Sequence, residues 1–187
     1  IEAGPDLLGS MSQESKAHAL KYLQDLGVEV MLRTLVKDYN GEEVILADRE
    51  AIQTQTLLWA AGIKPNRIGG IEEDSYAPNG RIFVDDFSEV KGCPGVFALG
   101  DISLMTQADY PKGHPQVAQV AIQQAVCLAT NLHRIEEGKE KKVFKYKDLG
   151  SMATVGRKLA VVDLPFIKFQ GIIAWFTWLF VHLMAIL

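Results

Sequence analysis

The chain has 187 residues, of which 48% are hydrophobic and 22% charged, and its formal net charge is −4. This composition is typical of a globular protein with an adequate core and excludes a disordered chain. The negative charge and the lack of a Lys/Arg block argue against a nucleic-acid partner.

The first residues resemble the end of a strand followed by a turn, since Ile1-Glu2 precedes Ala3-Gly4-Pro5. Ser10 or Ser12 is suited to N-cap a helix that ends at Gly27. Residues 28–32 (VEVML) then predict a buried strand. Because the chain also stops inside an apolar run, we expect it to be a portion of a longer protein.

A hairpin is predicted next. Asn40-Gly41 separates residues 34–39 from residues 43–46, and Asn-Gly is typical of type I′ turns, which need positive φ. Residues 54–60 predict a further strand, which Ala61-Gly62 would end.

Two short strands are predicted in the second half, over residues 81–84 and 95–99, the latter ending at Gly100-Asp101. Pro115 stands where prolines begin helices, so Gln116 to about Glu137 should be helical. Three more strands are predicted over residues 144–148, 152–155 and 158–162, with glycines at the turns. Mixed strands and helices with glycine at strand ends indicate an α/β architecture.

Gly100-Asp101 is the strongest local signal for a site. A buried strand would bring this pair to its C-terminal edge, where ligands bind in open α/β sheets. Glycine allows a ligand to approach the backbone, and aspartate offers two acceptor oxygens to hydroxyl groups. The alternative is that Asp101 caps a turn.

Three segments occur in the order and spacing of a known superfamily: residues 56–62 (TLLWAAG), 80–85 (GRIFVD) and 94–101 (PGVFALGD). They resemble the flavoprotein reductases that contain two Rossmann-like dinucleotide-binding domains. The resemblance implies that Asp101 binds the ribityl chain of FAD and that Gly100 is the glycine of close approach.

A narrower resemblance rests on residues 118–124 (AQVAIQQ), 152–160 (MATVGRKLA) and 174–183 (AWFTWLFVHL). These are similar to the type II NADH dehydrogenases. The resemblance implies hydride transfer from NADH to FAD and then two-electron transfer to a membrane quinone, without proton pumping. The protein would position two rings and perform no covalent catalysis. Ala125, where a glycine is expected, and the polar residues 114–117 depart from the family pattern.

Gln116, Gln119 and Gln123 share one face of the predicted helix. In the family context the start of this helix, with Ala118 and Gln119, would face FAD, and its dipole would stabilise negative charge on the reduced ring. Gln119 and Gln123 would then bind the quinone. The alternative is a solvated glutamine stripe.

Glu2 fits the acidic position at the end of the second strand of a Rossmann unit, which accepts hydrogen bonds from ribose hydroxyls. It would select NADH over NADPH by repelling a 2′-phosphate. The resemblance adds Ala61 and Gly62 to the NADH site. The alternative is an ordinary surface glutamate.

The apolar run over residues 171–187 has three interpretations. A transmembrane helix needs about 20 residues, more than this run offers. A buried helix is the second, and a helix at the membrane surface near a quinone route is the third, favoured by Trp175 and Trp178 on one face. We therefore expect peripheral attachment to the cytoplasmic face of a cell membrane. His182 lacks a second ligand at helical spacing, and no metal site is predicted.

We assign residues 1–64 to the NADH-binding domain, 65–138 to the returning part of the FAD domain, and 139–187 to a region facing quinone and membrane. The unpaired edge of a partial sheet favours a homodimer. No G-x-G-x-x-G sequence occurs, so we expect this chain alone to be inactive.

Two other functions stay open. One is a soluble FAD-dependent NADH reductase of the same fold that acts on a protein or disulfide acceptor, against which the apolar tail argues. The other is a membrane-associated module without cofactors.

Overall fold

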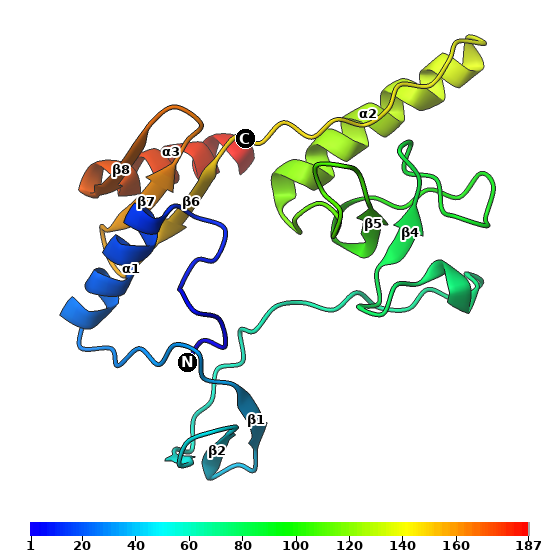
Figure 1. Cartoon of the computed structure of the whole chain (residues 1–187). Helices are drawn as coiled ribbons and strands as arrows, with labels where there is room; N and C mark the ends of the chain where they lie inside the picture. Colours follow the sequence, from blue (N-terminus) through cyan, green and yellow to red (C-terminus); the bar gives the residue numbers. More distant parts are fainter. Residues whose placement is uncertain (187) are drawn as a thin grey trace. The chain divides into compact units, whose positions relative to one another are not determined.

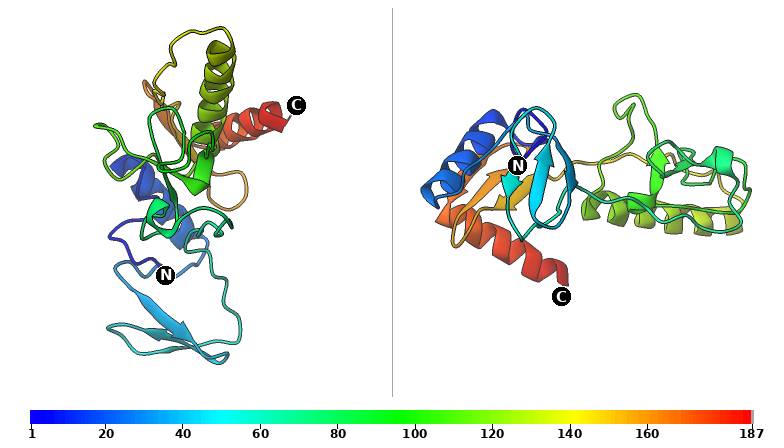
Figure 2. Two further views of the ribbon diagram at one scale, coloured as in Figure 1. Left: turned by 90° about the vertical axis from the view of Figure 1, so that its right-hand side faces the viewer. Right: turned by 90° about the horizontal axis from the view of Figure 1, so that it is seen from below.

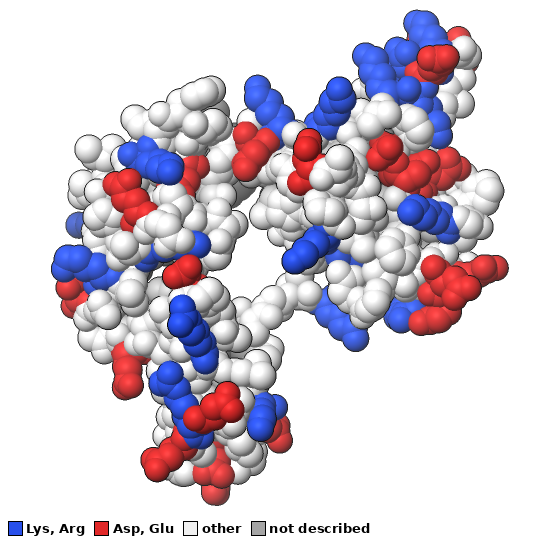
Figure 3. All heavy atoms as spheres, viewed as in Figure 1, with Lys and Arg blue, Asp and Glu red and all other residues white. Residues whose placement is uncertain are grey.

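A computed structural model describes residues 1–186, with side chains as far as Met184. The chain forms two compact units (Figure 1). The first unit combines residues 1–60 with the residues from 149 onward, and the second unit comprises residues 61–148. Both units contain helices and strands, so the predicted α/β class is confirmed. Figure 3 shows acidic and basic side chains mixed over the face that it presents.

The first helix, α1 (Gln13–Asp25), has the ends that its sequence predicts. The Oγ atom of Ser12 accepts a hydrogen bond from the Ser15 N–H at 3.4 Å. At the other end Gly27 has a φ of 79°. The N–H of Val28 then donates to the carbonyl of Leu23 at 3.0 Å, as in a Schellman motif.

A three-stranded antiparallel sheet lies against α1 in the first unit. It contains β6 (Ser151–Thr154), β7 (Ala160–Asp163) and β8 (Lys168–Gly171), with β7 in the middle. Helix α3 (Ile172–Ile186) follows and covers the other face of the sheet (Figure 2). The three residues of β7 from Ala160 to Val162 are fully buried, because helices cover both faces of this strand.

The predicted hairpin is confirmed as β1 (Val36–Tyr39) and β2 (Glu43–Leu46), and β3 (Ile52–Gln53) pairs with β2. The predicted type I′ turn is wrong. Such a turn needs a positive φ at both central residues, and here Gly41 has a positive φ but Asn40 does not. The turn is instead held by the side chain of Asn40, whose Oδ1 atom accepts hydrogen bonds from the backbone N–H groups of Glu42 and Glu43, both at 2.9 Å.

The second unit is built around β4 (Ile82–Val84), which pairs in parallel with β5 (Ser103–Met105). Short 3₁₀ turns, η1 (Glu73–Ser75) and η2 (Gly100–Ile102), precede these strands. The buried apolar core of this unit consists of Tyr76, Ile82, Val84, Val90, Met105 and Phe144.

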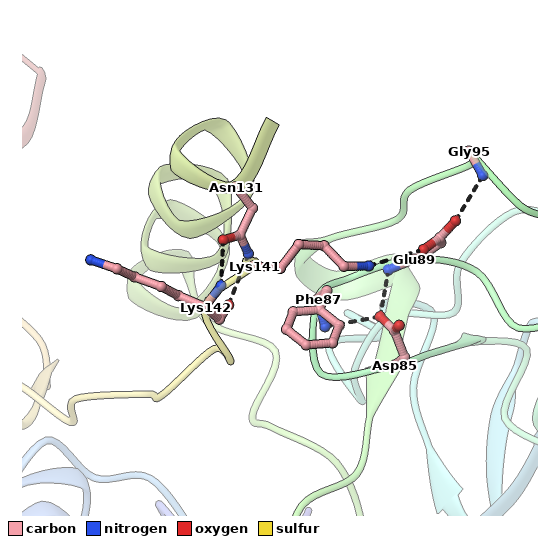
Figure 4. A network of polar contacts seen from close by, with 7 residues as sticks. All are labelled: Asp85, Phe87, Glu89, Gly95, Asn131, Lys141 and Lys142. Atoms are coloured by element: carbon pink, nitrogen blue, oxygen red, sulfur yellow. Dashed lines mark hydrogen bonds and ion pairs between the residues drawn. The ribbon is translucent and has the colours of Figure 1, made fainter. Parts of the chain in front are cut away.

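Helix α2 (Ala118–Glu136) begins two residues later than predicted, with Val117 as its N-cap residue. The chain then returns along α2, held by amide side chains. Asn131 accepts from the Lys142 N–H at 2.7 Å and donates to its carbonyl at 2.8 Å (Figure 4). Gln123 likewise accepts from the Lys147 N–H and donates to the Lys147 carbonyl, each at 2.9 Å.

A polar network ties the turn after β4 to this returning segment (Figure 4). Asp85 accepts hydrogen bonds from the N–H groups of Phe87 and Glu89, both at 2.9 Å. Lys141 pairs with Glu89 at 3.4 Å, and its ammonium lies 4.3 Å from the centre of the Phe87 ring.

Three of the predicted strands are wrong within the described residues. Residues 28–32 are irregular, and Val28 is 44% exposed. Residues 54–60 follow the short strand β3, and Leu58 is 88% exposed. Residues 144–148 form no strand: the Phe144 N–H donates to the Asp86 carbonyl, the Phe144 carbonyl accepts from the Gln107 side chain, and Lys147 bonds the amide of Gln123 in α2. An apolar pattern predicts an extended backbone, but a strand also needs a neighbouring strand to pair with.

The strand predicted over residues 95–99 is also wrong. This segment makes a single bridge, between Phe97 and Glu89, and the strand that pairs with β4 comes after Gly100-Asp101 rather than before. Strand β8 was not predicted, because its lysine and glycine disfavour a strand in isolation.

Candidate functional site

Gly100-Asp101 forms the start of the turn η2 and lies against α2 in the second unit. Gly100 has a φ of 70°, a conformation that favours glycine. A Cβ atom on Gly100 would lie 3.1 Å from the Cβ of Ala121. Glycine is therefore required here both by the backbone and by the close approach of the helix.

Three side chains form hydrogen bonds with the backbone of this turn. The Gly100 N–H donates to Oε1 of Gln124 at 2.7 Å. The hydroxyl of Ser103 donates to the Gly100 carbonyl at 3.0 Å, and Gln116 Nε2 donates to the Asp101 carbonyl at 3.1 Å. Asp101 itself is exposed, so its carboxylate can reach a ligand.

A buried guanidinium lies close to this turn. Arg81 is 7% exposed, and its Nε donates to the Ser103 carbonyl at 2.8 Å. A terminal nitrogen donates to the His114 carbonyl at 3.2 Å. Burial lowers the pKa of Arg81, and the negative charge of Asp101 acts in the opposite direction. The buried positive charge of Arg81 thus lies near the exposed negative charge of Asp101 on the turn.

His114 lies in an aromatic cage just before α2. Its ring centre is 4.3 Å from that of Tyr110, 5.3 Å from Phe144 and 5.8 Å from Tyr146. Nε2 is 3.0 Å from the Gln107 side-chain oxygen. Burial lowers the pKa of His114, and the positive charge of Arg81 lowers it further. The imidazole is therefore held in its neutral form.

Burial raises the pKa of Tyr146 to about 12, helped by Asp148 and Tyr110. This phenol is consequently protonated at neutral pH and contributes to the cage as an uncharged ring.

The structure brings the four residues predicted to bind FAD to one end of α2. Gly100 and Asp101 form the turn that contacts the helix, Ala118 is its first residue, and Gln119 is half-buried in its first turn. Gln123 is further along, and both ends of its amide are bonded to the Lys147 backbone. The sequence assigned no role to Gln124, Arg81 and His114, although two of them lie in the quoted segments, because burial and distant partners cannot be read from a motif.

The residues predicted for the NADH site are divided between the two units. Glu2 belongs to the first unit, where its Oε1 accepts a hydrogen bond from the Gly4 N–H at 2.6 Å. Ala61 and Gly62 are the first residues of the second unit and are exposed. Gly62 has a φ of 98°, and a Cβ added there would meet no atom within 4 Å. Its conformation, not crowding, accounts for the glycine.

The apolar helix α3 presents a stripe of exposed side chains. Ile173 (69% exposed), Phe176 (59%) and Phe180 (64%) follow one another at helical spacing. Trp175, which the sequence placed with Trp178 at an interface, packs instead against the buried core of the first unit. We call Ile173, Phe176 and Phe180 the α3 stripe.

In the described part of the chain, every helix is too short or too polar to cross a membrane. The same residues contain no group of His, Cys, Asp and Glu suited to a metal ion.

The family model of the pyridine nucleotide-disulphide oxidoreductases matches residues 1–125, which include the Gly100-Asp101 turn. The chain belongs to this family. The match ends within α2 and leaves the β6–β8 sheet and α3 outside it.

Similarity to curated proteins extends over nearly the whole chain. It is 34% identical to the type II NADH:quinone oxidoreductase Ndh of Mycobacterium tuberculosis, over 98% of the chain and 41% of that protein. It is 32% identical to the internal alternative NAD(P)H-ubiquinone oxidoreductase A1, mitochondrial, of Arabidopsis thaliana, over 92% of the chain and 37% of that protein. The chain thus spans about two fifths of the length of these relatives.

Solved structures agree on the fold. NDH2 from Plasmodium falciparum, in complex with NADH, superimposes with a TM-score of 0.86 over 100% of this chain and 54% of that chain, at 17% identity. The sulfide:quinone oxidoreductase of Aquifex aeolicus gives a TM-score of 0.71 over 95% of this chain and 46% of its own, at 16% identity. The predicted Rossmann-like flavoprotein fold is therefore confirmed.

Proposed function

We propose that the full-length protein is a type II NADH:quinone oxidoreductase. It passes hydride from NADH to FAD and then two electrons to a membrane quinone, without pumping protons. The observation that carries this proposal is the Gly100-Asp101 turn held against the start of α2, in a chain 34% identical to such an enzyme over 98% of its length.

The described residues fit FAD at this turn. The exposed Asp101 carboxylate would accept hydrogen bonds from ribityl hydroxyls. Gly100, which the resemblance makes the glycine of close approach, lets the turn pack closely against α2. The first turn of α2, with Ala118 and Gln119, would face the ring, where the helix dipole stabilises negative charge. FAD, when bound, supplies hydride acceptance and onward electron transfer.

NADH would be held by Glu2 through its ribose hydroxyls. We assign Ala61 and Gly62 to NADH binding as well. The carboxylate of Glu2 now accepts from the Gly4 N–H, and a ribose hydroxyl would add to or replace this bond. A 2′-phosphate in the same place would meet a like charge, which favours NADH over NADPH.

The quinone would bind near Gln119, whose amide offers a donor to a quinone carbonyl. Gln123 is the second candidate, and both ends of its amide bond the Lys147 backbone. The domain assignment follows the same proposal: residues 1–64 for NADH, 65–138 for FAD and 139–187 for quinone and membrane.

The α3 stripe would lie on the membrane surface, since three large apolar side chains exposed on one helix face are suited to the lipid boundary. We propose peripheral attachment to the cytoplasmic face, and a homodimer as the assembled form.

The test is the full-length protein itself. It should purify with bound flavin and oxidise NADH faster with a quinone than with a soluble protein or disulfide acceptor, and it should sediment with membranes. A preference for a soluble acceptor would indicate a reductase of another kind. Absence of flavin would indicate a module without cofactors.

A further inference from the structure

Gln124 lies on the face of α2 that turns toward the Gly100-Asp101 turn. Its side chain is 1% exposed, and its Oε1 accepts the Gly100 N–H at 2.7 Å. Gln124 follows Gln119 by five residues, which places the two side chains about 140° apart around the helix. Gln124 therefore acts on the turn and not on a ligand beside Gln119.

The turn η2 depends on this bond because no side chain of its own caps its first N–H. Leu99, the N-cap residue of η2, makes no side-chain hydrogen bond with it. The acceptor comes instead from a helix 24 residues away in the sequence. Without it, a partly buried N–H would lose its partner, which is costly.

We infer that Gln124 is a positioning residue for the flavin. Its bond to Gly100, together with the close contact between Gly100 and Ala121, sets how the turn sits on the start of α2. That placement sets the position of the Asp101 carboxylate relative to the N-terminus of α2, so that both can contact the same bound molecule. The inference rests on the proposed function, because it takes FAD to be that molecule.

The experiment compares three variants of the full-length protein with the wild type. Gln124→Met keeps the volume but removes the acceptor, whereas Gln124→Glu keeps an acceptor oxygen. Asn131→Leu is the matched control: it removes another buried amide from α2, one that bonds the Lys142 backbone and not the turn.

We expect Gln124→Met to raise the FAD dissociation constant about ten- to hundredfold and to shift the flavin midpoint potential, since one hydrogen bond to a buried group is lost. Gln124→Glu should bind FAD nearly as tightly as the wild type. Asn131→Leu should lower the Tm but leave FAD binding and the midpoint potential unchanged. If the role of Gln124 were merely structural, Gln124→Met would behave in the same way as Asn131→Leu.

Wild-type FAD affinity and potential in Gln124→Met would overturn the inference. If Gln124→Met does not fold, Gln124→Glu decides: a folded Gln124→Glu protein that binds FAD much more weakly than the wild type would show that the acceptor oxygen does not matter and would overturn the inference. A wild-type protein that binds no flavin would instead overturn the proposed function, and with it this inference.

Discussion

At the scale of single residues, the candidate site has one exposed carboxylate on a turn whose backbone groups are already hydrogen-bonded to side chains. Gln124, Ser103 and Gln116 bind the N–H and carbonyl groups of Gly100 and Asp101. A ligand therefore meets a turn that needs little further ordering, which lowers the entropic cost of binding.

Replacement of Asp101 by alanine should weaken FAD binding. A hydrogen bond to a charged group contributes about 1.5–3 kcal/mol, so we expect at least a tenfold rise in the FAD dissociation constant. Flavin content after purification and titration of the apoprotein measure this. Asp109→Ala, at another exposed position of the second unit, is the control. Full flavin occupancy and unchanged affinity in Asp101→Ala would remove Asp101 from the site.

Replacement of Glu2 by glutamine should change the cofactor preference. Without the carboxylate, the apparent KM for NADH should rise and discrimination against NADPH should relax, because a 2′-phosphate no longer meets a like charge. The ratio of kcat/KM for the two cofactors measures this. An unchanged ratio excludes Glu2 from the NADH site.

His114 should make the stability of the second unit depend on pH. Because its pKa is lowered in the fold, the folded state binds fewer protons than the unfolded state in mild acid. The free energy of unfolding should reach its maximum above the unfolded histidine pKa of about 6.5. It should fall as the pH drops through that value and level off below the folded pKa.

The variant His114→Gln can still bond Gln107 but cannot titrate. Denaturant unfolding of wild type and variant at several pH values between neutral and mildly acid should give a flatter profile for the variant. His133→Gln, which removes an exposed histidine from α2, should leave the wild-type slope in place. Parallel profiles for wild type and His114→Gln would contradict this prediction.

At the scale of elements, α1 is joined to the sheet through the carboxylate of Asp163. Its Oδ2 accepts the Ser12 N–H at 2.6 Å, and its Oδ1 accepts the hydroxyls of Ser12 at 2.9 Å and Ser15 at 2.6 Å. Burial would raise the pKa of Asp163, but these hydrogen bonds together hold it below its usual value. A negative charge at the start of α1 also suits the helix dipole.

Asp163→Ala should lower the free energy of unfolding of the first unit by roughly 1.5–3 kcal/mol, as expected for hydrogen bonds to a charged group. In the wild type this contribution is present above the unfolded pKa of about 3.9 and is lost as the pH falls through the folded pKa. Denaturant unfolding at neutral pH measures the difference. Asp25→Ala, which removes an exposed ion pair with Lys21, should cost only about 0.3–0.5 kcal/mol. Equal effects of the two variants would show that Asp163 does not join helix and sheet.

Several elements that the sequence predicts correctly have local partners. The cap of α1 by Ser12, its end at Gly27 and the hairpin around Asn40-Gly41 all depend on neighbours within a few residues. Residues 144–148 are different: they pair with no strand, and their hydrogen-bond partners are Asp86, Gln107 and Gln123, which lie more than 20 residues earlier in the sequence. Gln124 was not predicted for the same reason, since its partner is 24 residues away.

At the scale of the whole molecule, the two compact units differ in how the chain builds them. The second unit is one continuous segment with its own core and a parallel strand pair. The first unit joins both ends of the chain, because strand β7 lies between α1 and α3. A change at the end of the chain should therefore act on α1, which lies more than a hundred residues earlier in the sequence.

A chain that ends at Asp148 tests this consequence. Without residues 149 onward, α1 loses the strand β7 on which it packs and the carboxylate that binds Ser12. An amphipathic helix of this length is marginal on its own, so its amides should exchange with solvent far faster than in the whole chain. The amides of β4 and β5 should keep their protection, because their core lies within residues 61–148. Hydrogen exchange of both chains measures each element separately, with the second unit as the internal control. Retained protection of α1 in the shortened chain would show that residues 1–60 fold without the β6–β8 sheet.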